Sequence, residues 1–467
     1  MKTLMITLVI IFSIFGNNLF AQNIEGIWQG NLEVQPGKTM LFIFKISESN
    51  KSYFTKLDIP SQGLKNLQPA STTFLDNNLI INASNLGFKF DGMLNEESGE
   101  IKGSFQEGLN IVPLILIKKI KAEQVETPKR PQEPSKPYPY LVEEVNIYNS
   151  EDHISLAGTL TLPKSSNQHT PVVILISGSG PQDRNEAYMG HKPFLVLADY
   201  LTRKGIAVLR YDDRGVGEST GNFEKATTVD FSNDVLKIIE FLKNRTDIDT
   251  HNIGLIGHSE GAIIAPKVAN NSKNVSFIVM LAGTGVLGKQ VSLQQALDYR
   301  NFPVEDEEKY RDYIVKAIDI AASDKDITIV KKDLKSFYQD SEVLNSILPP
   351  NINKDEFIEN LVKSRTNPWI RYFYNYNPAE EIAKIGIPAL ALYGSKDTQV
   401  PPKYNMQAVK EALEESNSEN YEVVLMQGLN HLFQESTTGH ISEYPKIEET
   451  MSPKVLEKIS GWILNEI

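Results

Sequence analysis

The spacing of apolar and polar residues divides the chain into two parts with different patterns. In the first part, short apolar stretches alternate with Gly, Asn, Ser and Pro, which is typical of strands joined by turns. Three such stretches are Met40–Ile46, Leu79–Ile81 and Ile111–Ile117. This pattern predicts a small all-β domain over residues 22–120, built as an antiparallel sandwich or barrel.

The second part begins at Tyr140 and follows a different rule. Val142–Tyr148 and Ile154–Leu162 predict an antiparallel hairpin, and short apolar runs then alternate with longer helical patterns. The runs are Val172–Ile176, Ile206–Leu209, Ile253–Ile256, Phe277–Leu281, Ala389–Tyr393 and Val423–Met426. Strands separated by helices predict an α/β domain over residues 140–467, with a doubly wound, mostly parallel sheet.

The alternation is interrupted once, by about a hundred residues between Leu281 and Ala389. We expect an inserted, mostly helical cap at about 286–376. The segment is rich in aromatic residues: Tyr299, Phe302, Tyr310, Tyr313, Phe337, Tyr338, Trp369, Tyr372, Phe373, Tyr374 and Tyr376. Core packing explains most of them, and a few are expected to line an apolar acyl or aryl pocket.

Two segments outside these domains have simple interpretations. Residues 121–139 contain five prolines among charged residues, which predicts an extended, semi-rigid linker. At the start, Lys2 precedes an apolar run, Leu4–Phe15, and a small residue, Ala21. This predicts a cleaved signal peptide over residues 1–21 and a secreted or periplasmic protein without stable membrane insertion; a retained anchor is the alternative.

Composition narrows the possible functions. The net charge of -12 opposes binding to nucleic acid. The chain has no cysteine, which excludes disulfides, thiolate nucleophiles and Cys-based zinc sites. The sequence contains no H-E-x-x-H motif or similar ligand cluster, so it predicts no catalytic metal.

A glycine pattern at Gly283, Gly285 and Gly288 matches G-x-G-x-x-G after a strand. Followed by Lys289 it also resembles a P-loop, but Gln290 stands where Ser or Thr would hold Mg²⁺. A dinucleotide site usually lies on the first strand of its unit. We therefore predict no cofactor and interpret this loop as a connection to the cap.

The pentapeptide Gly257–Gly261, GHSEG, matches the G-x-S-x-G pattern of a serine nucleophile. It follows the apolar run Ile253–Ile256 and precedes the helical pattern Ala262–Ala269. This strand–turn–helix context lifts the serine hydroxyl clear of the sheet, and the turn needs very small residues on both sides of the serine. Ser259 is the predicted nucleophile.

Residues 140–467 resemble α/β-hydrolases, among them bacterial carboxylesterases with an N-terminal β domain. The stretches that carry this resemblance are Ile176–Asn185 (ISGSGPQDRN), Tyr211–Ser219 (YDDRGVGES), Gly257–Gly261, Gly394–Pro401 (GSKDTQVP) and Gly428–His431 (GLNH). Within Tyr211–Ser219, Arg214 is interpreted as a loop organiser. Residues 23–119 are less well covered; Gly26–Gly30 (GIWQG) resembles the Gly-x-Trp opening of lipocalin-like barrels, and a Trp plugging a small β core is the favoured interpretation.

A serine needs a base and an orienting carboxylate. In this fold both follow the nucleophile, the carboxylate first. That leaves His431 and His440 as candidate bases, and His431 is favoured because it follows the last predicted strand. Asp397 follows the penultimate strand and is the predicted acid. The side chain of His258, adjacent to Ser259, is expected to point elsewhere.

Acyl transfer also needs two N–H donors for the developing oxyanion. The backbone N–H of Glu260, directly after the nucleophile, is one. The resemblance implies Ser179 as the other, with Gly178 or Gly180 as alternatives, because many relatives have His where this chain has Ser177.

The sequence thus predicts a carboxylesterase-type serine hydrolase (EC 3.1.1.-) that cleaves a small-molecule ester through an acyl-Ser259 intermediate. A serine peptidase of the prolyl oligopeptidase type and an acyl thioesterase or acyltransferase are alternatives with the same chemistry. A glycan- or lipid-binding protein is the non-enzyme alternative. The sequence predicts neither the ester nor the oligomeric state.

Overall fold

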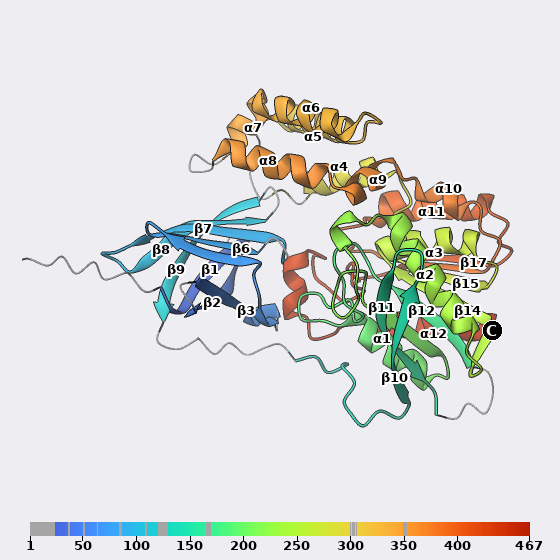
Figure 1. Cartoon of the computed structure of the whole chain (residues 1–467). Coiled ribbons are helices and arrows are strands. Elements are labelled where there is room, and N and C mark those ends of the chain that lie inside the picture. Colours follow the sequence, from blue (N-terminus) through green and yellow to red (C-terminus); the bar gives the residue numbers. More distant parts are fainter. Residues whose placement is uncertain are drawn as a thin grey trace, which may run out of the picture.

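The computed structural model describes residues 24–35, 38–49, 52–62, 64–83, 86–107, 110–119, 129–164, 170–298, 300, 304, 306–348 and 353–467. The predicted signal peptide, the first part of the linker (121–128), Tyr299 and Phe302 lie outside the described residues. The chain forms a β domain, an α/β domain and a helical layer beside both (Figure 1).

The N-terminal domain is a closed antiparallel barrel. Its elements are β1 (Gly26–Gln35), β2 (Lys38–Ser49), β3 (Ser52–Ile59), η1 (Pro60–Gln62), β4 (Leu64–Leu67), β5 (Ser71–Leu75), β6 (Asn78–Ala83), β7 (Phe88–Asn95), β8 (Glu100–Glu107) and β9 (Asn110–Lys119). The ring runs β1-β9-β8-β7-β6-β5-β3-β2 and closes because β2 also pairs with β1; β4 pairs with β3 outside the ring. The predicted all-β domain is therefore a barrel and not a sandwich.

Alternate residues of the strands point into the barrel, as the burial of every second residue of β6 shows. The interior is apolar and contains Phe42, Phe44, Phe88, Phe90 and Phe105. Trp28 is buried among them, and its Nε1 donates to the carbonyl of Ile24 at 2.7 Å. The Trp of the Gly-x-Trp pattern thus packs in the β core, as predicted.

The α/β domain is built on one sheet, whose mostly parallel, doubly wound character was predicted. Its strands are β10 (Leu141–Asn149), β11 (Ile154–Leu162), β12 (Thr170–Ile176), β13 (Ala207–Tyr211), β14 (Ile248–His258), β15 (Val275–Leu281), β16 (Ala389–Gly394) and β17 (Tyr421–Met426). They lie in the order β10-β11-β13-β12-β14-β15-β16-β17. The predicted hairpin β10–β11 is antiparallel and pairs antiparallel with β13, and all further pairs are parallel.

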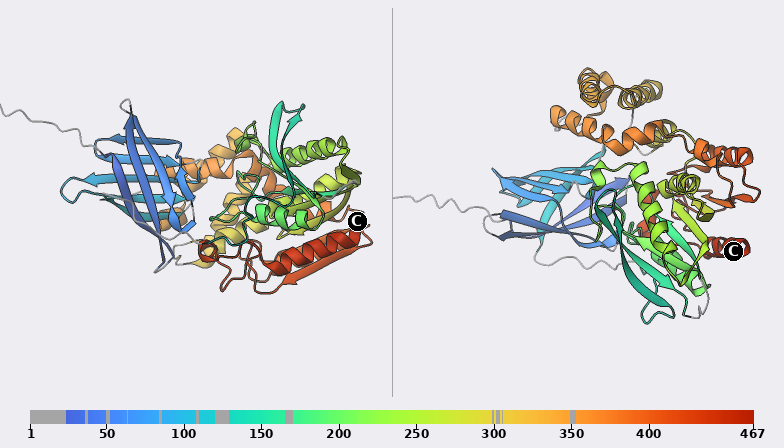
Figure 2. Two further views of the ribbon diagram at one scale, coloured as in Figure 1. Left: turned by 90° about the horizontal axis from the view of Figure 1, so that it is seen from below. Right: turned by 45° about the vertical axis from the view of Figure 1, so that its right-hand side comes forward.

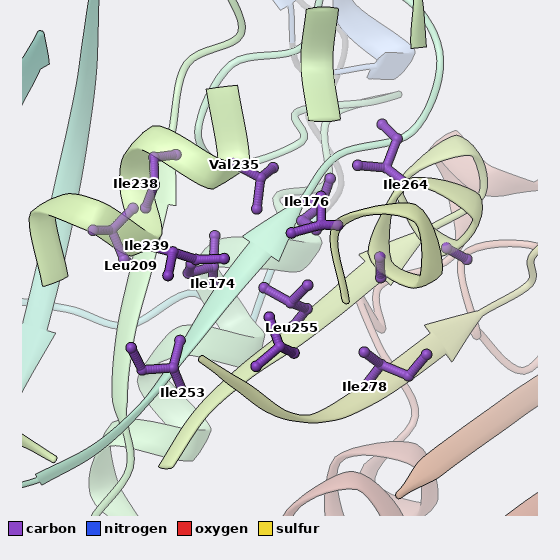
Figure 3. Packing of buried hydrophobic residues seen from close by; sticks show 14 of the residues in the cluster. Ile174, Ile176, Leu209, Val235, Ile238, Ile239, Ile253, Leu255, Ile264 and Ile278 are labelled. Carbon is purple, nitrogen blue, oxygen red and sulfur yellow. The ribbon is translucent and has the colours of Figure 1, made fainter. Parts of the chain in front are cut away.

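Helices cover both faces of this sheet, which explains why its central strands are apolar throughout. One face packs on α1 (Pro193–Arg203) and α12 (Pro453–Glu466). The other packs on α2 (Thr228–Lys243), α3 (Glu260–Asn271), α10 (Pro378–Ile382) and α11 (Pro402–Glu415). Figure 3 shows this second interface, where Ile174 and Leu255 of the sheet meet Val235 and Ile264 of the helices. Short 3-10 turns are η3 (Phe223–Lys225) and η4 (Ile441–Lys446).

A helical cap is inserted between β15 and β16. It consists of α4 (Gly288–Asp298), α5 (Glu307–Ala321), α6 (Ile327–Gln339), α7 (Glu342–Ile347), α8 (Lys354–Arg365) and α9 (Pro368–Asn375). Tyr310, Tyr313, Tyr338 and Tyr374 form its own core, so core packing accounts for these aromatic residues. A second group, which we call the α9 cluster, joins Ile263 of α3 to Val291, Phe373 and Tyr376, with Trp369 packed against it.

The barrel lies at one end of the molecule and the carboxyl terminus at the other (Figures 1 and 2). The barrel touches the cap through an ion pair between Lys89 and Glu356 (2.5 Å). The described half of the linker lies against the α/β domain, because Arg130 donates to the carbonyls of Gly190 and Ile447 at 3.0 and 2.9 Å. Among the described residues, no helix is long and apolar enough to cross a membrane.

Candidate active site

Ser259 stands on the turn between β14 and α3 in a strained backbone conformation. Its φ of 53° and ψ of -111° lie in a region that non-glycine residues rarely adopt, and its N–H donates to the carbonyl of Leu281 at 2.8 Å. A Cβ on Gly257 would lie 2.0 Å from the oxygen of Gly261, and a Cβ on Gly261 would lie 2.0 Å from the oxygen of Ile176. The two glycines therefore let β12, β14 and α3 approach closely enough to form this turn.

Asp397 and His431 form a buried pair. Nδ1 of His431 lies 2.7 Å from Oδ2 of Asp397, and the two side chains are 5% and 0% exposed. The other oxygen, Oδ1, accepts the backbone N–H groups of Gln399 and Val400 at 2.8 and 2.9 Å. The carboxylate is held on both sides, and Nε2 is left as the nitrogen of His431 that can act as a base.

The structure brings these three residues to the same edge of the sheet, because Ser259, Asp397 and His431 follow the carboxyl ends of β14, β16 and β17. The backbone carbonyl of His431 lies 3.0 Å from Nε2 of His258, the neighbour of Ser259. The ring centroids of His258 and His431 are 4.7 Å apart. His440, the alternative base, instead starts η4 with its Nδ1 near Ser442 (3.1 Å).

The loop after β12, residues 177–182, is held by hydrogen bonds to the buried carboxyl of Asp213. The hydroxyl of Ser177 donates to Oδ1 of Asp213 at 2.8 Å, and the backbone N–H of Gln182 donates to Oδ2 at 3.1 Å. Burial raises the pKa of Asp213 well above its usual range. The hydroxyl of Ser177 thus fixes the loop that carries the expected second oxyanion donor.

Gly178 is excluded as this donor, because its N–H donates to Oε1 of Glu186 at 2.7 Å. Ser179 and Gly180 remain. The loop passes directly beside the nucleophile, since a Cβ on Gly178 would lie 3.2 Å from Cβ of Ser259. The Ser179 assignment stays a prediction, now with one alternative instead of two.

Glu260 is the first residue of α3, so its backbone N–H has no acceptor within the helix. Its carboxyl is buried, and Oε1 accepts from Thr228 Oγ1 (2.8 Å) and from Nε1 of Trp369 (2.7 Å). Burial raises the pKa of Glu260 to about 6, and the two hydrogen bonds only partly oppose this. Because Trp369 belongs to the cap, this side chain joins the cap to the nucleophile turn.

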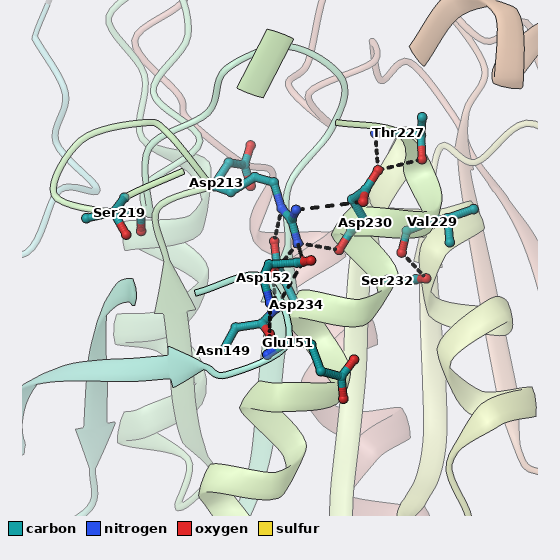
Figure 4. A network of polar contacts seen from close by, with 12 residues as sticks. Asn149, Glu151, Asp152, Asp213, Ser219, Thr227, Val229, Asp230, Ser232 and Asp234 are labelled. Atoms are coloured by element: carbon teal, nitrogen blue, oxygen red, sulfur yellow. Dashed lines mark hydrogen bonds and ion pairs between the residues drawn. The ribbon is translucent and has the colours of Figure 1, made fainter. Parts of the chain in front are cut away.

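Arg214 organises a loop, as the sequence predicted. Its guanidinium donates to both oxygens of Asp234 (2.7 Å each) and to Asp152 (2.8 Å). Figure 4 shows Asp152, Asp230 and Asp234 around this network, between the β10–β11 turn and α2. These bonds join Arg214 to Asp152 and Asp234 and not to His431 or Asp397, so they give Arg214 a structural role.

The glycines of the loop after β15 serve close packing. Gly285 donates its N–H to Asn405 at 3.0 Å, and a Cβ on Gly288 would lie 1.8 Å from the oxygen of Phe373. Within the part of the chain that the structure describes, no group of three His, Asp or Glu residues is placed to hold a metal ion.

Two residues of the site were not predicted from the sequence. Glu186 contacts His258 across 72 positions of the chain, and Trp369 contacts Glu260 across 109. Neither stands in a motif with a functional interpretation. The one available signal was that Trp369 belongs to an aromatic-rich segment, and that signal does not single out one residue.

Comparison with known proteins gives partial matches. The acyl transferase family matches residues 142–340. The esterase EstD of Thermotoga maritima is 28% identical over 314 residues, which cover 66% of this chain and 65% of EstD. An acyl transferase of Shewanella woodyi is 35% identical over 149 residues, which cover 31% of this chain and 45% of that protein. The chain thus spans less than two thirds of EstD and less than half of the acyl transferase.

Solved structures also match this chain at low identity. The Pyrococcus furiosus esterase Pf2001 is 17% identical with a TM-score of 0.43, covering 73% of this chain and 98% of that one. Est1E of Butyrivibrio proteoclasticus, solved with ferulic acid, is 16% identical with a TM-score of 0.39, covering 69% and 98%. The strand order and the strained serine turn show that residues 140–467 have the fold predicted from the sequence, a doubly wound, mostly parallel sheet with a helical cap.

Proposed function

We propose that the protein hydrolyses carboxylic esters through an acyl-Ser259 intermediate. The observation that carries this proposal is the buried pair of His431 and Asp397, tied through His258 to a serine on a strained turn. The similarity to EstD, which is named as an esterase, supports it. Serine first, then the carboxylate, then histidine is the chain order that α/β-hydrolases use.

The geometry supports a two-step reaction. Nε2 of His431 takes the proton of the Ser259 hydroxyl as its oxygen attacks the ester carbonyl, and Asp397 stabilises the imidazolium that forms. The backbone N–H groups of Glu260 and Ser179 receive the oxyanion. His431 then protonates the leaving alcohol, and afterwards activates the water that releases the acid.

The proposed substrate is a small ester with an apolar acyl or aryl group. The α9 cluster supplies apolar side chains next to α3, whose first turn adjoins Ser259. Binding pockets for such groups are mostly lined by hydrophobic and aromatic side chains.

The direct test is Ser259→Ala with a panel of short, long and aryl esters. We expect kcat/KM to fall by at least about 10⁴-fold with the fold intact by circular dichroism, because the nucleophile is removed and only the surrounding donors remain. Ser272→Ala, at the other end of α3, is the matched control and should keep wild-type activity. A wild-type protein that neither hydrolyses the panel nor reacts with a fluorophosphonate probe would favour the binding-protein alternative.

Acyl transfer is a second candidate, favoured by the match of residues 142–340 to the acyl transferase family. The same acyl-enzyme would then be attacked by an alcohol in place of water. Turnover of an ester in the presence of a second alcohol distinguishes the two: a hydrolase gives mainly free acid, and a transferase gives mainly the new ester.

We also propose that residues 1–21 are removed during export. The support is the charged, apolar and small-residue order of Lys2, Leu4–Phe15 and Ala21. Mass spectrometry of the protein made from the full gene in a bacterial host tests this. A mature chain starting at Gln22 is expected, and an intact N-terminus in the cytoplasmic fraction would contradict export.

A further inference from the structure

A second histidine–carboxylate pair adjoins the proposed nucleophile. Nδ1 of His258 lies 2.8 Å from Oε1 of Glu186, and the two side chains are only 8% and 4% exposed. The reaction proposed above uses neither side chain. A buried charged pair is costly unless further hydrogen bonds satisfy it, so its partners indicate what it does.

Both ring nitrogens of His258 face acceptors. Nδ1 faces the carboxylate of Glu186, and Nε2 faces the backbone carbonyl of His431 at 3.0 Å. A carbonyl oxygen carries no proton, so Nε2 must donate to it, and a carboxylate has acceptor sites only, so Nδ1 donates to Glu186 as well. The ring is therefore an imidazolium that pairs with a carboxylate.

The charged groups around the ring agree with this protonation. Burial alone lowers the pKa of His258, but the charge and hydrogen bond of Glu186, the carbonyl of His431 and the charge of Asp397 outweigh it. The pKa of His258 therefore lies above its ordinary value.

The pair of Glu186 and His258 connects the segments that carry the reacting groups of the proposed reaction. Oε1 of Glu186 holds both the ring of His258 and the N–H of Gly178, the residue before Ser179. The ring holds the backbone of His431, and the chain continues from His258 into Ser259. The oxyanion loop, the nucleophile and the base are thus linked through one carboxylate oxygen and one imidazolium.

The backbone of Glu186 is held in a strained conformation. Its φ of 51° lies in the left-handed region, which is unfavourable for a residue of this size. Its N–H donates to the carbonyl of Asp183 at 2.8 Å, which holds it in a tight turn. Such strain persists where the surroundings fix the residue, and it is common near functional sites.

We propose that Glu186 and His258 are positioning residues, which hold the oxyanion loop and the base His431 in register with Ser259. This inference rests on the ester hydrolysis proposed above. In this proposal neither side chain contacts the substrate. Glu186 also neutralises the cation beside His431, since an unpaired positive charge there would repel the charge that His431 acquires during the reaction.

The test is Glu186→Gln, which keeps the shape and the acceptor for Gly178 but removes the negative charge. We expect kcat to fall by about 10- to 100-fold with KM within about twofold, because supporting residues act on the geometry of the reacting groups and not on ground-state binding. The rate of fluorophosphonate labelling should fall in parallel, and Glu186→Asp should recover part of kcat. The double variant Glu186→Gln, His258→Asn should lose no more than the worse single variant, because the two act as a unit.

Asp234→Asn is the matched control, because it breaks another buried ion pair, with Arg214. It should lower stability while kcat of the folded enzyme stays within about twofold. If Glu186→Gln behaves like this control, the pair is structural only and the inference is wrong. An inactive wild type would instead contradict the proposed function, so the two failures are distinguishable.

The wild-type protein gives a readout that does not depend on a variant folding. With ¹⁵N-labelled histidine, NMR should show both ring nitrogens of His258 protonated at neutral pH. As pH rises through its raised pKa, the ring must lose one of its bonds, to Glu186 or to His431, and kcat should fall with it; His258→Asn should lack this step. A neutral His258 ring at pH 7 would overturn the inference.

Discussion

At the scale of single residues, the carboxyl of Glu260 shows how a side chain beside the nucleophile destabilises the fold. It is buried between α2 and the cap, and burial raises its pKa from 4.5 to about 6. Between these two pH values the folded state holds a proton that the unfolded state has lost. Stability therefore falls as pH rises from about 4.5 to about 6 and stays lower above it.

Replacing Glu260 by Gln should remove this pH dependence. The amide oxygen can still accept from Thr228 and Trp369, whereas the buried charge is gone. We expect the free energy of unfolding to rise by up to about 2 kcal/mol at about pH 8 and to be unchanged at about pH 4. Urea denaturation at both pH values measures this. A loss of stability at the higher pH would show that the carboxylate, and not its burial cost, dominates.

At the scale of elements, the site depends on how closely β12, β14 and α3 approach one another. Gly257 and Gly261 leave no room for a side chain, since a Cβ on either would lie 2.0 Å from a backbone oxygen. The strain of Ser259 is thus maintained by packing of whole elements. The cap adds to this junction through Trp369 and the α9 cluster.

A single methyl group at Gly257 should therefore damage the fold as well as the site. We expect Gly257→Ala to cost about 3 kcal/mol or more, because the obstacle is backbone that cannot rotate away. Gly461→Ala is the matched control: it lies in α12 with nothing within 4 Å of the added Cβ. Helix propensity predicts that it stabilises by about 0.5–1 kcal/mol. Thermal melts of both variants test the contrast, and a harmless Gly257→Ala would contradict it.

At the scale of the whole molecule, contacts of different strength hold the barrel and the linker against the rest of the chain. One contact of the barrel with the cap is the partly exposed pair of Lys89 and Glu356, whereas the linker residue Arg130 donates to backbone carbonyls of the α/β domain. Exposed ion pairs contribute about 0–1 kcal/mol and weaken with salt. Charge-assisted bonds to backbone carbonyls contribute more.

Arg130→Ala should release the linker, and Lys89→Ala should not. We expect protease cleavage within residues 129–139 to accelerate by about tenfold or more in Arg130→Ala, because about 1.4 kcal/mol of lost docking already opens the segment tenfold more often. Cleavage in Lys89→Ala should stay within about threefold of wild type. Equal rates in the two variants would place the attachment elsewhere.

Much of this organisation follows from local sequence patterns. Apolar periodicity predicted the β10–β11 hairpin, the parallel strands and the helical insertion. This is possible because the spacing of apolar residues over a short stretch of chain indicates which face of a strand or helix is buried. The G-x-S-x-G turn named Ser259, and chain order after it named Asp397 and His431, which the structure places side by side (2.7 Å). Their catalytic roles stay predictions until the variants are measured.

Tertiary structure alone decided the rest. The alternation of apolar and polar residues does not distinguish a sandwich from a barrel; the pairing of β1 with both β2 and β9 does. The partners Glu186 for His258 and Trp369 for Glu260 come from distant segments that no short-range period connects. Local pattern specifies which face of an element is buried, and only the packing of elements specifies which side chains meet there.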